Sequence, residues 1–177
     1  MKLTRIDASH PLFEASFTLY EASFPPNERR MREDHLRALQ DADFSPLGAV
    51  EDGVLLADVF LWETEDFCYL EHFAVQPSLR GHGTGSTILR QLLTQDKPLI
   101  LEIEPPEDEI TCRRKHFYER NGLCAQPYGH AASISGRRSH CSACHHVKPE
   151  SKRAAVPRIS TISAEPCRPV HAVPENA

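Results

Sequence analysis

Residues 73–89, FAVQPSLRGHGTGSTIL, are the stretch that decides the fold. They join the end of a long apolar run to a glycine-rich loop, and apolar residues after that loop recur at helical spacing. The stretch therefore predicts a strand, a glycine loop and a helix in direct succession. Gly81, Gly83 and Gly85 leave backbone N–H groups unobstructed at the positive end of the helix dipole, which suits a bound pyrophosphate.

The spacing of the glycines distinguishes this loop from two common phosphate-binding motifs. A P-loop needs Gly-Lys-Ser/Thr, and no lysine follows these glycines. A dinucleotide-binding fold carries its glycines in the first βα turn, whereas this loop lies halfway along the chain. Glu102 and Glu104 lie about 20 residues further on, where that fold places an acidic residue, so this alternative stays open. A glycine-rich turn without any ligand stays open as well.

The elements around the loop predict a mixed α/β domain. Asp52-Gly53 between two apolar runs indicates a β-hairpin, and Ser9 is placed to cap the first helix. Arg30 and its arginine neighbours are expected to form a solvated face. The expected order is strand 2–7, a helix with the stripe Phe13, Phe17, Tyr20 and Phe24, helix 31–39, hairpin 47–51 and 54–62, strand 67–75, a helix from 83, strand 99–104 and a helix from 107–109 to 121.

The composition changes near residue 123. Residues 1–123 carry 13 Lys and Arg against 22 Asp and Glu, whereas residues 124–177 carry 7 against 3. The second part has no Leu, Phe, Met or Trp, so it has little with which to offset the entropy of ordering its backbone. The net charge of −5 argues against a nucleic-acid binder. No apolar run approaches the roughly 20 residues of a membrane span, so no membrane contact and a cytoplasmic location are expected.

Three motifs in the first part resemble the GNAT superfamily of acetyl-CoA-dependent N-acetyltransferases. The loop matches the acetyl-CoA signature Arg/Gln-x-x-Gly-x-Gly/Ala through Arg80, Gly83 and Gly85. HFYERNGL at residues 116–123 resembles the family's later motif, and FPPNERR at 24–30 resembles the start of the acceptor-side helix. The resemblance covers about residues 2–123 in the right order.

This resemblance implies a mixed, splayed central sheet flanked by helices, with acetyl-CoA as cosubstrate. It implies acetyl transfer to an amine of a small molecule or peptide by direct attack in a ternary complex, and it leaves a homodimer open. Tyr118 matches the usual proton donor to the departing thiolate. The residues expected along acetyl-CoA are Phe73, Ala74, Val75, Arg80, Gly81, His82, Gly83, Thr84, Gly85 and Ser86.

The candidates for the general base are acidic residues on the acceptor side. Glu71 shares strand parity with Phe73 and Val75, and burial would raise its pKa toward a useful value. Pairing with a nearby arginine is the alternative for Glu71. Glu28, Glu102 and Glu104 are lower-ranked candidates, and ordered water could replace a dedicated base. His72 is expected to be a packed or surface histidine rather than a catalytic one.

Residues 124–177 depart from the family, whose members follow the Asn-Gly turn with two more strands. We expect those two strands to be missing or altered, and the segment to be a separate, disordered tail. A change of reading frame near residues 122–124 is the leading hypothesis. A zinc site on Cys141, Cys144, Cys167 and His171 is a rival, although no metal site is assigned. The alternative function is a non-catalytic nucleotide- or CoA-binding protein, or a zinc-stabilised interaction protein.

Overall fold

The structure is a computed structural model that describes residues 1–125, 129–134, 137–142 and 162–163. Its helices and strands alternate in the order expected from the sequence. The elements are β1 (Lys2–Arg5), α1 (Phe13–Ser23), α2 (Arg32–Ala38), β2 (Phe44–Glu51), β3 (Val54–Glu63), β4 (Cys68–Val75), the short 3-10 helix η1 (Pro77–Leu79), α3 (Thr84–Leu92), β5 (Leu99–Leu101), α4 (Glu109–Arg120), β6 (Cys124–Ala125), β7 (Gly129–Ile134), β8 (Arg137–Ser142) and β9 (Ile162–Ser163).

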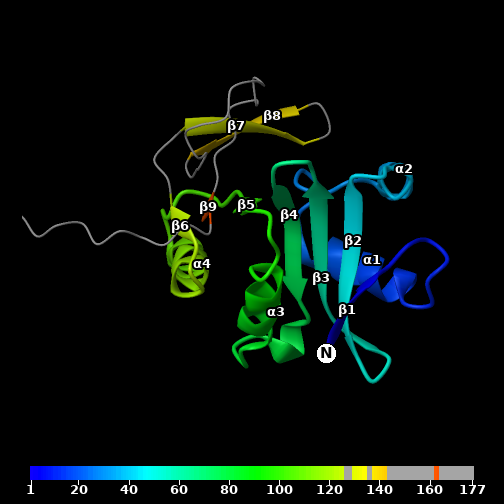
Figure 1. Cartoon of the computed structure of the whole chain (residues 1–177). Coiled ribbons are helices and arrows are strands. Elements are labelled where there is room, and N and C mark those ends of the chain that lie inside the picture. Colours follow the sequence, from blue (N-terminus) through cyan, green and yellow to red (C-terminus); the bar gives the residue numbers. More distant parts are fainter. Residues whose placement is uncertain (126–128, 135–136, 143–161, 164–177) are drawn as a thin grey trace, which may run out of the picture.

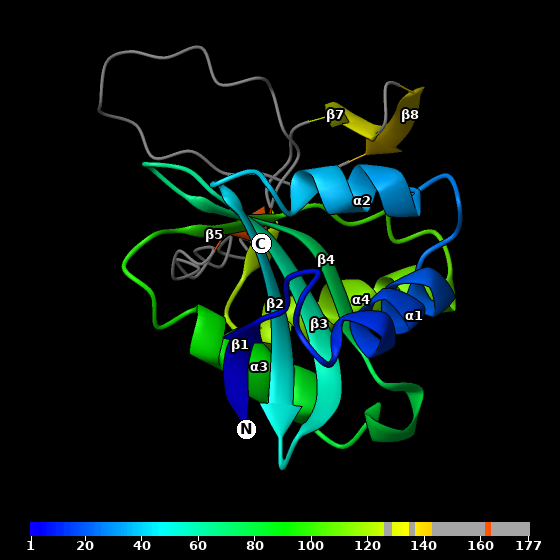
Figure 2. The ribbon, with the colours of Figure 1, turned by 90° about the vertical axis from the view of Figure 1, so that its right-hand side faces the viewer.

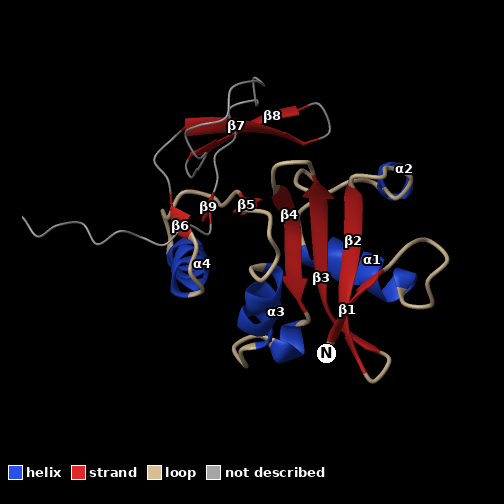
Figure 3. Cartoon of the chain, in the orientation of Figure 1, coloured by secondary structure: helices blue, strands red, loops and turns tan. Residues whose placement is uncertain are grey.

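A mixed sheet forms the centre of the molecule (Figures 1 and 3). Its strand order within the described residues is β1-β2-β3-β4-β5-β9-β6. The first four strands pair antiparallel, and the β2–β3 hairpin turns at Asp52-Gly53, as the sequence predicts. β4 pairs parallel with β5, so the connection through the glycine loop and α3 is a βαβ unit.

Helices cover both faces of this sheet (Figure 2). On one face, the aromatic stripe of α1 packs with Leu39, Phe44 and Phe60, and α2 lies beside it. On the other face, α3 and α4 pack against β3, β4 and β5 through a larger apolar cluster that includes Ile88 and Leu101. Two cores on opposite faces of one sheet are the arrangement expected of a mixed α/β domain.

β4 and β5 pair only at their beginnings. The parallel register joins Cys68, Tyr69 and Leu70 of β4 to Leu99, Ile100 and Leu101 of β5, and there β5 ends while β4 continues for five residues. After β5 the chain leads away from β4 toward α4 (Figure 1). The pairing of β4 with β3 also shifts here, because Phe60 lies opposite His72 while Leu61 lies opposite Leu70. Glu71 is therefore the extra residue of a β-bulge.

One expected helix start is wrong, at α1, and another is confirmed, at α4. Ser9 does not cap α1, because its hydroxyl donates to Asp7 Oδ1 and the helix begins only at Phe13 after Leu12. α4 begins at Glu109, where Asp108 and Thr111 form a reciprocal capping box. Competition from an Asx turn, which satisfies the serine locally, explains the difference at α1.

The second part of the chain contains more strand than its composition predicts. β7 and β8 form a separate two-stranded sheet, and the two-residue strands β9 and β6 extend the main sheet beyond β5. The expectation of altered final strands agrees with this, and backbone pairing does not require apolar side chains. Disorder, the reading-frame hypothesis and most of the zinc-ligand set concern residues outside the described ranges. No helix in the described part is long and apolar enough to cross a membrane.

Candidate active site

The glycine loop leads directly into the N-terminus of α3. Gly81 and Gly83 have φ of 80° and 84°, a left-handed conformation that disfavours residues with a Cβ. The first helical hydrogen bond runs from the Thr87 N–H to the Gly83 carbonyl at 3.0 Å. The N–H groups of the first turn, at Thr84 and its two successors, therefore lie outside the helical ladder and can bind an anion.

The edges of the loop are fixed to β4 and α4. Arg80 Nε donates to the carbonyl of Val75 at 3.0 Å, which holds the arginine beside the end of β4. His82 Nδ1 lies 2.9 Å from the carbonyl of Arg80. Asn121, at the end of α4, donates from Nδ2 to Ser86 Oγ at 3.1 Å. This last contact is not predictable from the loop alone, although Asn121 is part of the second motif.

Gly85 allows α3 to approach its neighbours closely. A Cβ at this position would lie 3.4 Å from both the Phe117 ring and the Val75 side chain. The centre of the Phe117 ring in turn lies 6.3 Å from the centre of the Phe73 ring. Phe73 and Val75 thus face the α3–α4 core, whereas Ala74 is buried on the α1 face. The backbone of residues 73–75 lies along the side of β4 from which β5 has separated.

Tyr118 lies on the α3–α4 face of the sheet. Its ring belongs to the same apolar cluster as Leu70 of β4, Leu101 of β5 and Ile103, which follows β5. Burial raises the pKa of the Tyr118 hydroxyl to about 12. The phenol therefore stays protonated at neutral pH, as a proton donor must.

Glu71 does not have the properties expected of a general base. Arg30 Nη2 donates to Glu71 Oε1 at 2.6 Å and to Oε2 at 2.8 Å, and Trp62 Nε1 donates to Oε2 at 3.0 Å. Burial alone raises the pKa of this carboxyl, but His72, whose Nδ1 lies 3.5 Å from Oε2, and the Arg30 charge outweigh it and bring the pKa to about 2. A carboxylate held this firmly as an anion is a poor proton acceptor.

Two structural features explain why Glu71 differs from the expected base. The β-bulge adds one residue to β4, so Glu71 lies on the face of Trp62 and not on that of Phe73 and Val75. The solvated face predicted for Arg30 is wrong, because its side chain is largely buried and stacks over Phe44 and Trp62. The packed histidine is confirmed, because His72 is 3% exposed.

Glu102 has the acid–base properties that Glu71 lacks. It follows β5 directly, and its neighbours Leu101 and Ile103 both face the α3–α4 core. Alternation of side chains therefore directs Glu102 toward the opposite, α1-side face. Burial raises the pKa of this half-buried carboxyl to about 7. Glu28, whose pKa is raised by burial and by the charge of Glu104, approaches the same region from the α1–α2 loop.

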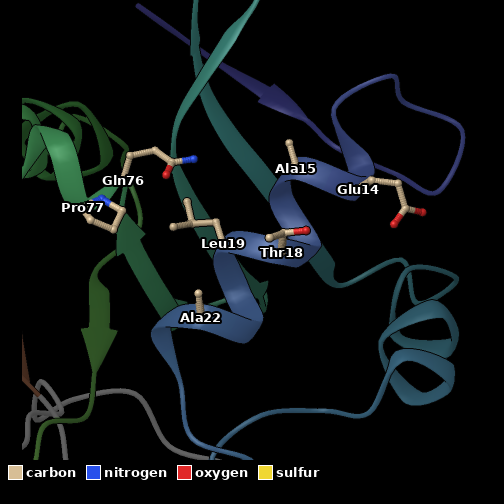
Figure 4. Close-up of a pocket in the computed structure, with 7 residues that line it drawn as sticks. All are labelled: Glu14, Ala15, Thr18, Leu19, Ala22, Gln76 and Pro77. Atoms are coloured by element: carbon tan, nitrogen blue, oxygen red, sulfur yellow. The ribbon is translucent and has the colours of Figure 1, made fainter.

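A pocket of about 440 Å³ lies elsewhere, between α1 and the end of β4 (Figure 4). One face of α1 lines it together with Gln76 and Pro77, through Glu14, Ala15, Thr18, Leu19 and Ala22. None of the residues expected to contact acetyl-CoA or to take part in catalysis lines this pocket. Within the described ranges, no group of three or more potential metal ligands is present either.

The combination of a bulged β4, a diverging β5 and a glycine loop at a helix N-terminus matches a known family. The profile of the Acetyltransferase (GNAT) family fits residues 10–123. The chain belongs to the GNAT acetyltransferase family. This confirms the predicted family, the α/β fold class, the transferase class and acetyl-CoA as the cosubstrate of that class.

Individual relatives agree with the family assignment. The chain is 33% identical over 78 residues to YjbC of Bacillus subtilis (strain 168), assigned as an acetyltransferase, in an alignment spanning 43% of this chain and only 38% of that relative. A GNAT-family structure from Bacteroides thetaiotaomicron has 27% identity and a TM-score of 0.73, covering 81% of this chain and 84% of that one. A GNAT acetyltransferase from Elizabethkingia anophelis, solved with acetyl-CoA bound, shares the fold at 12% identity and a TM-score of 0.53, over 80% and 92% of the two chains.

Proposed function

We propose that this protein transfers the acetyl group of acetyl-CoA to an amine of a small molecule or peptide, by direct attack within a ternary complex. The observation that carries the proposal is the end of the β4–β5 pairing after Leu70, which leaves residues 71–75 of β4 unpaired with β5, up to the glycine loop that opens α3. In the proposed complex, the backbone of residues 73–75 borders the pantetheine arm, and residues 80–86 border the pyrophosphate. Arg80 adds a permanent positive charge at the edge of that loop.

The proposed chemistry moves protons at two atoms, the acceptor nitrogen and the leaving sulfur. Glu102 takes a proton from the acceptor ammonium, so that the neutral amine attacks the thioester carbonyl carbon. A carbon–nitrogen bond forms, the carbon–sulfur bond breaks, and the departing thiolate receives a proton from Tyr118. The second proton that the attacking nitrogen loses restores the Tyr118 hydroxyl through solvent. A base whose pKa lies near the working pH combines a useful ionised fraction with useful basicity, which supports Glu102 in this role.

Thiol release from acetyl-CoA tests this function on the full chain. The assay uses a panel of tyramine, spermidine, lysine and a peptide with a free N-terminus, and calorimetry measures acetyl-CoA binding in parallel. We expect saturable binding, and thiol release that depends on one of these acceptors and yields its acetylated product. Binding without turnover would instead support the non-catalytic alternative, and absence of binding would contradict the assigned cosubstrate site.

A further inference from the structure

The α1–α2 loop, residues 24–31, is fastened to β4 and α1 by buried polar contacts. Arg30 on this loop forms the ion pair with Glu71, and the Arg30 N–H donates to the Tyr20 hydroxyl at 2.8 Å. His72 Nε2 lies 2.9 Å from the carbonyl oxygen of Glu28 and donates to it, since a carbonyl only accepts. Consecutive residues of the β4 bulge thus hold both ends of the segment from Glu28 to Arg30.

This attachment differs in kind from the other ion pairs of the same region. The side chains of Arg30 and Glu71 are 14% and 12% exposed, and the guanidinium lies 5.2 Å from the Phe44 ring centre and 5.5 Å from that of Trp62. The neighbouring Arg29 is 16% exposed and pairs with Glu21, whose side chain is 45% exposed, so in that pair only the carboxylate is open to solvent. Removing one partner of a buried pair costs far more than removing one partner of an exposed pair, because the remaining charge is left desolvated.

The same bulge also marks the place where β4 leaves β5. Glu71 is the inserted residue, and the last paired residue of β4 immediately precedes it. The loop meets β4 at this same place, because Arg30 pairs with Glu71 and the Glu28 carbonyl lies 2.9 Å from His72 Nε2. One residue therefore connects the backbone that borders the acetyl donor to the loop that borders the acceptor.

From this geometry we propose that Glu71 is a positioning residue, which holds the α1–α2 loop against the β4 bulge through Arg30 and so shapes the acceptor side of the active site. The proposal rests on the function proposed above. Glu71 exchanges no proton in this role. Its loss should loosen residues 24–31 and weaken acceptor binding, while acetyl-CoA binding and the pH dependence of the chemical step stay as they are.

Hydrogen–deuterium exchange tests the positioning role without any need for turnover. In Glu71→Gln, we expect exchange of the peptide covering residues 24–31 to rise at least about tenfold, with α3 and α4 unchanged. The matched control is Glu21→Gln, which breaks the more exposed pair on the same loop and should leave the exchange as in the parent chain. Unchanged exchange in Glu71→Gln would overturn the proposal.

Kinetics with the best acceptor of the panel separate positioning from base catalysis. We expect Glu71→Gln to raise the acceptor KM about tenfold or more and to retain the acid limb of the kcat profile. Loss of that limb with an unchanged KM and unchanged exchange would make Glu71 the base and refute the positioning role. If the parent chain acetylates nothing in the panel, the proposed function fails, and the exchange result still decides the role of Glu71.

A milder variant covers the case in which Glu71→Gln does not fold. Arg30→Lys keeps the charge but loses the planar guanidinium, whose Nη2 donates to both carboxylate oxygens and whose plane stacks on the Phe44 and Trp62 rings. We expect it to raise exchange of residues 24–31 and the acceptor KM in the same direction by a smaller factor. Exchange and KM equal to those of the parent chain would contradict the proposal.

Discussion

Ser16 of α1 donates its hydroxyl hydrogen to Asp58 Oδ1 of β3 over 2.7 Å, in a contact buried between helix and sheet. The other carboxyl oxygen of Asp58 is buried, and no described residue forms a hydrogen bond with it. Burial raises the pKa of Asp58 to about 7, against the smaller opposing effect of the Ser16 hydrogen bond. Burial at this position is therefore least costly when Asp58 is protonated, although the Ser16 hydrogen bond by itself favours the ionised carboxylate.

Asp58→Asn should stabilise the protein above neutral pH. Between pH 3.8 and about 7 the folded state binds a proton that the unfolded state has lost, so the unfolding free energy of the parent chain falls as pH rises. Asparagine keeps the acceptor for Ser16 and cannot ionise. It should therefore avoid a loss of unfolding free energy that reaches about 4 kcal/mol in the parent chain at pH 8. Urea denaturation at pH 4, 6 and 8 measures this. The exposed Asp96→Asn serves as control, and a less stable Asp58→Asn at pH 8 would contradict the expectation.

His35→Phe should remove a pH dependence of stability whose sign is opposite to that caused by Asp58. His35 is buried among aromatic rings, and burial together with the charge of Arg30 lowers its pKa to about 4. The unfolded state binds more protons between about pH 4 and 6.5, so this histidine reduces stability as pH falls through that window, by about 3 kcal/mol. Thermal denaturation from pH 4 to 7 should show a flatter profile for His35→Phe. The exposed His116→Gln should follow the parent profile, and a His35→Phe profile that does so too would refute the assignment.

The elements are easier to predict from the sequence than the side chains that meet between them. Strand, loop and helix follow from local patterns such as Asp52-Gly53 and the three glycines, which act within a few residues. The Arg30–Glu71 pair spans 41 residues of chain, and no local pattern distinguishes a buried arginine from a solvated one. Tertiary packing against Phe44 and Trp62 decides that difference.

The surroundings of Glu71 and Glu102 differ from those expected from the sequence for a similar reason. A regular strand would place Glu71 on the face of Phe73, but the bulge inserts one residue and reverses the faces on either side of it. Nothing in FCYLEHFAV marks a bulge at its centre. The sequence alone ranks Glu102 below Glu71, because the desolvation that raises the pKa of Glu102 depends on neighbours brought together only by folding.

Gly83→Ala should weaken acetyl-CoA binding by more than its effect on stability explains. Gly53 in the β2–β3 turn provides the control, because it also has a positive φ, 77° against 84°, and open space around an added Cβ. Each alanine should cost about 1–2 kcal/mol of unfolding free energy. Only Gly83→Ala places a methyl group on the loop proposed to hold the pyrophosphate, so only it should raise the acetyl-CoA Kd, by about tenfold or more. Equal Kd values for the two variants in calorimetry would argue against the loop as the binding site.

Glu102→Gln should abolish the acid limb of the rate profile. If Glu102 accepts the ammonium proton, kcat/KM of the parent chain rises with pH and levels off above an apparent pKa near 7. The amide cannot accept that proton, so the rate should fall by about 10² to 10⁴ and the limb should disappear. Glu109→Gln, which changes an exposed residue at the start of α4, is the control. If the acid limb of the kcat/KM profile persisted in Glu102→Gln, a group other than Glu102 would be the base.

Tyr118→Phe should slow the departure of the thiol and leave the acetyl-CoA Kd unchanged. The phenol has a pKa of about 12, so it is fully protonated at every pH of the assay and can stabilise the developing thiolate. Its loss should lower kcat by about 10- to 100-fold. A thiol of lower pKa leaves more readily as the thiolate and needs less help from a proton donor. With an acetyl thioester of such a thiol, the difference in kcat between Tyr118→Phe and the parent chain should therefore be smaller than with acetyl-CoA. A difference of the same size with both donors would mean that Tyr118 acts on packing and not on the leaving group, because packing affects the two donors equally.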